Sequence, residues 1–198
     1  MAIKPNAGPV GGLGVVQQAL SLRARHPRTF STPLGGAAIP ATGSPVPIYD
    51  LTPAQLMQPD PLALARLARW CYPVADGLRM ALVDLHASPG GGPVEFGGLS
   101  RGLLADRFVQ AASMAEKLLA THAADLEPRL LDVPGLRFVA LWLHGQDEDH
   151  FVSLLGGRPP GSQALALVDD VVAGLRAQVA AQAPTSGLAH GPSSPPTN

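Results

Sequence analysis

Apolar and polar positions alternate most clearly along residues 100–123, where apolar residues recur every three or four positions. This spacing is typical of one face of a helix. The stripe consists of Leu104, Phe108, Ala111, Ala112, Ala115, Leu118 and Leu119. We expect Ser100 to cap this helix, because a serine side chain satisfies free backbone N–H groups at a helix start. A similar stripe predicts a second helix over 162–182, capped by Ser162.

Short apolar runs predict strands in the second half of the chain. "LRFVALWLHG" and "HFVSLL" predict strands near 137–144 and 150–155, and "GQDED" between them is short enough to form a hairpin loop. Both faces of the first strand are apolar, which is typical of a strand covered on both sides. "GLRMALVDLHA" at 77–87 is compatible with helix or strand, and the glycines around it favour a strand.

The first 70 residues contain weaker signals. Apolar residues at helical spacing predict a helix over 13–25, and the proline-rich stretch at 26–47 predicts an exposed linker. "IYDL" predicts a short strand, after which Thr52 followed by Pro53 is a good helix start. The next such start precedes "PLALARLARW" at 61–70, which we interpret as a helix ended by a proline.

Together these elements predict an α+β fold: a small, mainly antiparallel sheet with a C-terminal hairpin, covered by two long helices and flanked by disordered tails. We expect a flexible N-terminal segment at 1–47, a compact domain at 48–183 and a disordered tail rich in proline and serine at 184–198. The chain has 22 glycines and 21 prolines in 198 residues, so much of it must be turn, loop or tail.

Charge and composition narrow the classes of partner and the compartment. The net charge is -1 with no block of like charge, which argues against binding to nucleic acid or to an anionic membrane. No run of about 18 uncharged apolar residues is present, so we expect no membrane span. Cys71 is the only cysteine, and the N-terminus does not have the pattern of a signal peptide, which favours the cytoplasm.

Histidines and acids around the predicted hairpin form one candidate site. His144 and His150 would lie at the two ends of the loop, on one face, with Asp147 and Asp149 supplying oxygen ligands for a metal ion. Three or four converging donors are needed for such a site, however, and acids at a hairpin tip more often only solvate it. We therefore predict no metal or other cofactor.

Cys71 is the other chemically distinctive residue. Its thiol would act as a nucleophile with His86 or His144 as the base and Asp84 as the orienting acid. The surrounding "RWCYPV" contains no catalytic motif, and a cysteine on the apolar side of a helix is usually a small core residue.

Aromatic residues give the candidate partner-binding site. Trp70 and Tyr72, in "WCYP", stand where a predicted helix gives way to an extended segment, and such rings are favoured at recognition surfaces. Arg158 precedes the last helix and would help to hold a carboxylate. The glycine-rich stretches lack the residues that phosphate-binding loops require, and we interpret them as turns.

Two functions remain. The first is a non-enzymatic intracellular accessory protein that binds a protein or peptide partner through a sheet edge or an aromatic groove, and that itself has surfaces suited to homo-oligomerisation. The alternative is a small enzyme that uses the acidic hairpin with His144 and His150 to bind a metal, or Cys71 as a nucleophile.

Overall fold

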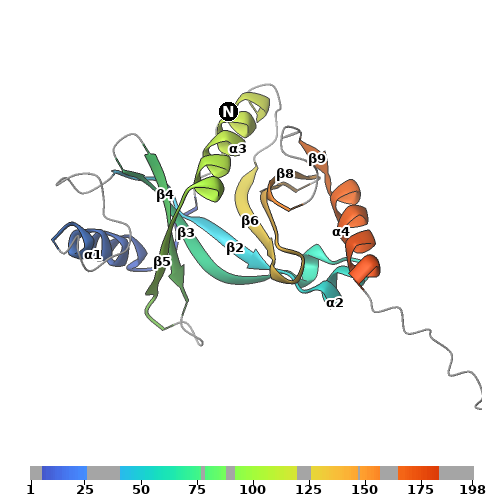
Figure 1. Ribbon diagram of the computed structural model, residues 1–198, viewed down its shortest axis with the longest axis horizontal. Helices are drawn as coiled ribbons and strands as arrows, with labels where there is room; N and C mark the ends of the chain where they lie inside the picture. Colours follow the sequence, from blue (N-terminus) through green and yellow to red (C-terminus); the bar gives the residue numbers. More distant parts are fainter. Residues whose placement is uncertain are drawn as a thin grey trace, which may run out of the picture.

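The computed structural model describes most of the chain. The described residues are 6–25, 41–76, 79–87, 92–119, 126–146, 148–156 and 165–182. The fold is α+β, with a mixed sheet and four α-helices within these ranges (Figure 1). None of these helices is both long and apolar enough to cross a membrane.

The sheet contains nine strands within the described ranges. They are β1 (Ala41–Thr42), β2 (Val46–Asp50), β3 (Arg66–Asp76), β4 (Arg79–His86), β5 (Glu95–Arg101), β6 (Glu127–Val133), β7 (Phe138–His144), β8 (Asp149–Leu155) and β9 (Ala166–Leu167). Eight of them lie in the order β5-β4-β3-β2-β6-β7-β8-β9, and β1 pairs with β3 beyond the end of β2. β2 and β6 pair in parallel, whereas the other described pairs are antiparallel. The sheet therefore consists of two antiparallel halves joined by one parallel pair.

Four α-helices cover this sheet: α1 (Gly12–Arg25), α2 (Pro53–Leu56), α3 (Leu103–Leu119) and α4 (Val168–Gln182). Two short 3-10 turns lie at Leu62–Leu64 and Pro134–Leu136. Figure 1 places α1 and α4 at the two ends of the molecule, with α3 between them. The Arg176 side chain links the short helix α2 to α4, because its Nε donates a hydrogen bond to the backbone carbonyl of Leu56 at 2.7 Å.

The two faces of the sheet bury different cores, because successive residues of a strand point to opposite sides. On one side, here called the α3 face, apolar residues such as Cys71 and Leu82 pack with the alanines and Phe108 of α3. On the other, the α1/α4 face, α1 packs Val16 and Leu20 on the β3–β4 end. α4 and α2 cover the β6–β8 end of that same face.

Several predicted elements are confirmed. The helix predicted over 13–25 is α1, and Thr52 forms a capping box with Gln55 at the start of α2. The strands predicted near 77–87, 137–144 and 150–155 are β4, β7 and β8. The sheet also contains six strands beyond these three, so it is larger than the predicted one.

The helix predicted over 61–70 is wrong. Residues 66–76 form β3, the longest strand, which pairs with β4 from Arg69 to Asp76. Its side chains alternate with a period of two: Cys71 lies on the α3 face, whereas Tyr72 lies on the α1/α4 face. Pairing with β2 on one side and β4 on the other therefore overrides the local helical spacing.

The predicted helix caps need correction as well. Ser100 belongs to β5, and α3 begins at Leu103, after Gly102 turns the chain with a φ of 85°. α4 begins at Val168, whereas the predicted cap Ser162 lies outside the described residues. Residues 1–5, 26–40 and 183–198, which include much of the predicted flexible segments, also lie outside them.

Candidate functional site

The two hairpin histidines do not converge. His144 pairs in register with Asp149, and His150 pairs with Leu143. Residues one position apart along a strand point to opposite faces, so the expectation that both imidazoles share a face is wrong. His144 Nδ1 lies 2.8 Å from Asp149 Oδ1, whereas His150 Nε2 lies 3.2 Å from Glu148 Oε1.

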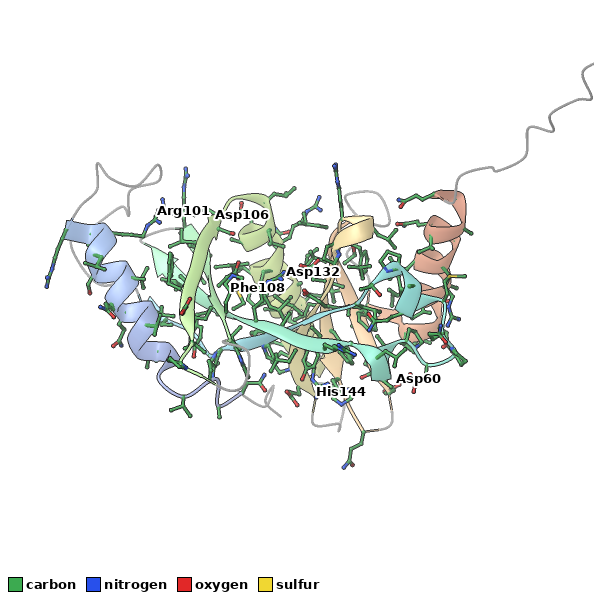
Figure 2. All side chains as sticks on the ribbon, turned by 90° about the horizontal axis from the view of Figure 1, so that it is seen from below. Asp60, Arg101, Asp106, Phe108, Asp132 and His144 are labelled. Atoms are coloured by element: carbon green, nitrogen blue, oxygen red, sulfur yellow. The ribbon has the colours of Figure 1, made fainter. Side chains whose placement is uncertain are left out.

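No group of three histidine, cysteine or acidic side chains within the described ranges is arranged to hold a metal ion. Asp147, the fourth predicted ligand, lies outside those ranges. The ring of His144 (Figure 2) instead packs against Trp142, with the ring centres 5.3 Å apart. Trp142 is buried and stacks on Phe151, so His144 is the polar end of a core aromatic cluster.

Cys71 lies in the core of the α3 face and has no solvent exposure. Burial raises the pKa of its thiol, and Asp84, its register partner on β4, raises it further, while Arg69 opposes these effects. The protonated thiol is thus strongly favoured at neutral pH, whereas nucleophilic chemistry requires the thiolate. This placement favours the core interpretation of Cys71.

Charged side chains form a network around Arg69, on the α3 face. Arg69 Nη1 lies 3.4 Å from Asp50 Oδ1, and Arg69 Nη2 pairs with Asp132, which Figure 2 labels near the middle of the molecule. Burial raises the pKa of both Asp50 and Asp84, although the guanidinium partly offsets the effect. One arginine thus serves several carboxylates across neighbouring strands, an arrangement that links the two halves of the sheet.

The predicted aromatic anchors lie beneath α1. Tyr72 is 3% exposed, and burial raises the pKa of its phenol. A Cβ added at Gly12 of α1 would lie only 2.6 Å from the Tyr72 hydroxyl oxygen, so the helix sits directly on this ring. Trp70, on the same face, is half-buried beside the same cluster. Arg158 lies outside the described residues.

A groove that the sequence analysis missed lies next to this cluster, between α1 and β5. It has a volume of about 180 Å³ and is lined by Val15, Gln18, Ala19, Leu22, Arg23 and Phe96. Leu22 is 46% exposed and Phe96 is 37% exposed, so large apolar surface is open to solvent there. The available signal was a second apolar stripe on α1: Val15, Ala19 and Leu22 recur at helical spacing beside the buried stripe.

The groove runs beside the edge of the sheet. β5 pairs with β4, and no other described strand pairs with it. The pairing shifts by one residue between Asp84 and Leu85 of β4, a β-bulge at which Gly97 is the extra residue of β5. A Cβ at Gly97 would lie 2.1 Å from Cδ2 of His86, so the bulge holds its backbone against that imidazole.

Two arginines belong to the elements that flank the groove, α1 and β5. Arg23, on the last turn of α1, lines the groove and is 9% exposed. Burial and the nearby guanidinium of Arg101, at the end of β5, lower the pKa of Arg23. Figure 2 shows Arg101 at the α1 end of the molecule. Arg23 thus lines the groove, and Arg101 ends the neighbouring edge strand.

Comparison with protein-family models, with curated proteins and with solved structures finds no match to this chain.

Proposed function

We propose that this protein is a non-enzymatic accessory protein that binds an extended peptide segment of a partner as an additional strand on β5. The single observation that carries the proposal is the meeting of two features: a strand at the end of the sheet and an open apolar groove beside it. Strand addition derives affinity from backbone hydrogen bonds and specificity from pockets for alternate side chains. The α1–β5 groove is such a pocket.

The size of the groove favours a peptide side chain as its ligand. Sites for small molecules and cofactors usually enclose about 300–1,000 Å³. The groove has about 180 Å³ and is open, which suits one or two side chains of a bound strand. Its lining of Val15, Ala19, Leu22 and Phe96 suits apolar ones.

The proposed compartment is the cytoplasm. Cys71 is the only cysteine and is buried in the core, so no disulfide contributes to this fold. A fold that relies on its apolar core without disulfides is typical of a reducing compartment.

The proposal can be tested with peptides selected from a display library of random dodecapeptides against the full-length chain. Leu22→Asp should weaken the binding of selected peptides at least tenfold, because a buried charge in the apolar pocket is unfavourable, by about 1.4 kcal/mol or more. Leu13→Asp is the matched control, since Leu13 also lies on α1, is 49% exposed and does not line the groove. Fluorescence anisotropy would measure both affinities.

Three results would contradict the proposal. The first is a selection that yields no binder. The second is equal affinity of the selected peptides for the wild type and for Leu22→Asp. The third is a loss of affinity in Leu13→Asp as large as that in Leu22→Asp. A thermal melt of each variant would establish that both remain folded. A concentration-dependent dimer abolished by Leu22→Asp would instead identify a second copy of the chain as the occupant of this edge.

A further inference from the structure

The side of β5 that faces away from α1 leaves space beside an aspartate. Asp84 of β4 pairs in register with Cys71 of β3 and with Gly98 of β5. Directly paired residues share a face, so Asp84 and Gly98 lie on the α3 face with Cys71. A Cβ added at Gly98 would meet no described atom within 4 Å beyond its chain neighbours, whereas the His86 ring lies against Gly97. Gly98 therefore leaves open space between Asp84 and the outer edge of the sheet.

The Asp84 carboxylate has no hydrogen bond or ion pair with any described residue, although it is half-buried. Arg69 is its diagonal neighbour on β3, but the terminal nitrogens of that guanidinium pair with Asp50 and Asp132 instead. Burial raises the pKa of Asp84 in spite of Arg69. One guanidinium therefore faces three carboxylates, and the excess charge on this part of the α3 face is negative.

A bound cation would complement this carboxylate. Charged side chains that are withdrawn from water are normally paired, and Asp84 is not paired within the described chain. A strand added outside β5 would lie about 5 Å from β5 and about 10 Å from β4, so a long side chain is needed to reach Asp84 across Gly98. Lysine and arginine combine this length with a positive charge. An acidic side chain there would be repelled by the carboxylates.

We propose that the bound segment carries a large apolar residue in the α1–β5 groove and, an odd number of positions away, a lysine or arginine that crosses Gly98 to pair with Asp84. This inference rests on the proposed strand addition at β5 and specifies the partner as an amphipathic basic strand. Phe96 pairs with Leu85, in the core beneath α1, whereas Gly98 pairs with Asp84 on the other face. Side chains on opposite faces of a strand are an odd number of positions apart, which gives the spacing.

The sequences of the selected dodecapeptides give the first test. They should be enriched for a lysine or arginine one or three residues from a large apolar residue, relative to the unselected library. Enrichment for a basic residue at even separations, or without a preferred separation, would overturn the inference. Enrichment for acids, or for no charged residue, would overturn it too.

A double-mutant cycle gives the second test, with synthetic peptides whose N-termini are acetylated so that the basic side chain is tested alone. Replacing that residue with glutamine should weaken binding to the wild type about fivefold and binding to Asp84→Asn less than twofold. Asp169→Asn is the matched control, because Asp169 is exposed on α4 and its replacement removes the same charge. The fivefold loss should persist in this control. Fluorescence anisotropy measures each affinity, and thermal melts establish that each variant is folded.

A second variant tests the path of the basic side chain. Gly98→Leu fills the open space without a clash among the described residues, and it should reduce the effect of the peptide's glutamine substitution to less than twofold. A fivefold effect that persists in Gly98→Leu or in Asp84→Asn would overturn the inference. An effect that disappears in Asp169→Asn would trace it to net charge and would overturn the inference as well.

These outcomes separate the two proposals. Peptides that require Leu22 but show no coupling to Asp84 would overturn the basic-partner inference and leave strand addition intact. Peptides that do not require Leu22 would overturn both.

Discussion

The two ends of the sheet are finished in different ways. At one end, β9 pairs with β8 at His150 and Phe151, and α4 packs over the same strand, leaving Phe151 1% exposed. At the other end, no described strand pairs with the outer edge of β5, and Phe96 is 37% exposed beside the α1–β5 groove. Within the described residues, one end, here called the closed end, therefore finishes in a two-residue strand beside a packed helix, whereas the other, the open end, finishes in a seven-residue strand beside an apolar groove.

Under the proposed function, the first end stabilises the fold and the second binds the partner. Exposed edge strands invite pairing with other chains, and proteins normally protect them with charges, bulges or covering elements. β5 has a bulge and an arginine, but it also has an apolar groove beside it, which a purely protective edge would not need. We interpret the closed end as structural and the open end as functional.

The largest expected effect concerns a matched pair of phenylalanines. Phe151→Ala should lower the free energy of unfolding by about 3–5 kcal/mol, because it leaves a cavity in the core under α4. Phe96→Ala should lower it by less than about 1 kcal/mol, because much of that ring is already in water. Urea unfolding of the two variants measures both changes, and equal losses would remove the distinction between the ends.

Two glycines provide a second comparison of intermediate size. Gly156, after β8, has a φ of 70°, and a Cβ there would lie 2.7 Å from the Arg137 carbonyl oxygen. Gly156→Ala should therefore lower the free energy of unfolding by about 2 kcal/mol, because the backbone of Arg137 cannot move aside. Gly97→Ala should lower the free energy of unfolding by about 1 kcal/mol or less, because the exposed His86 ring can rotate away from the new methyl group.

The His86→Ala variant tests whether the imidazole causes the loss of stability in Gly97→Ala. In that background, Gly97→Ala should have almost no effect on the free energy of unfolding measured in urea. A cost that persists without the imidazole would place the strain in the bulge backbone instead.

The smallest effect concerns Asp84, on β4 near the open end. Its pKa is raised, chiefly by burial, so the folded state binds this proton more readily than the unfolded chain does. The free energy of unfolding therefore falls as pH rises from the ordinary aspartate value through the raised one. Asp84→Asn should raise Tm at neutral pH by about 1–2 °C, and the gain should vanish near pH 4.

Thermal melts of the variant and the wild type across this pH range measure the difference directly. A variant that is less stable than the wild type at neutral pH would show that Asp84 stabilises Arg69 more than burial penalises it.

Elements whose apolar pattern reflects burial of one local face could be predicted from the sequence. In the predicted stripe of α3, Phe108, Ala111 and Ala115 are buried, and the continuous apolar run of β7 matches its two covered faces. β3 could not be predicted in this way. Leu64 and Leu67 imitate a helical stripe but are exposed, and the segment becomes a strand because β2 and β4 pair with it on both sides.

The candidate sites depended on register and on contacts distant in sequence. His144 and His150 face apart because the strands pair Leu143 with His150, and the sequence does not determine that register. The α1–β5 groove joins Leu22 and Phe96, which are far apart in the chain. The second apolar stripe of α1 showed that a surface was available, but not which strand would lie beside it.

Amide hydrogen exchange of the full-length chain, alone and with a selected dodecapeptide, tests the central claim most directly. We predict that the peptide slows exchange in β5, over Glu95–Arg101, and leaves β8, over Asp149–Leu155, unchanged, because strand addition gives new hydrogen bonds to the edge that receives it. Slower exchange in β8, or unchanged exchange in β5, would contradict the assignment of the open end as the binding edge.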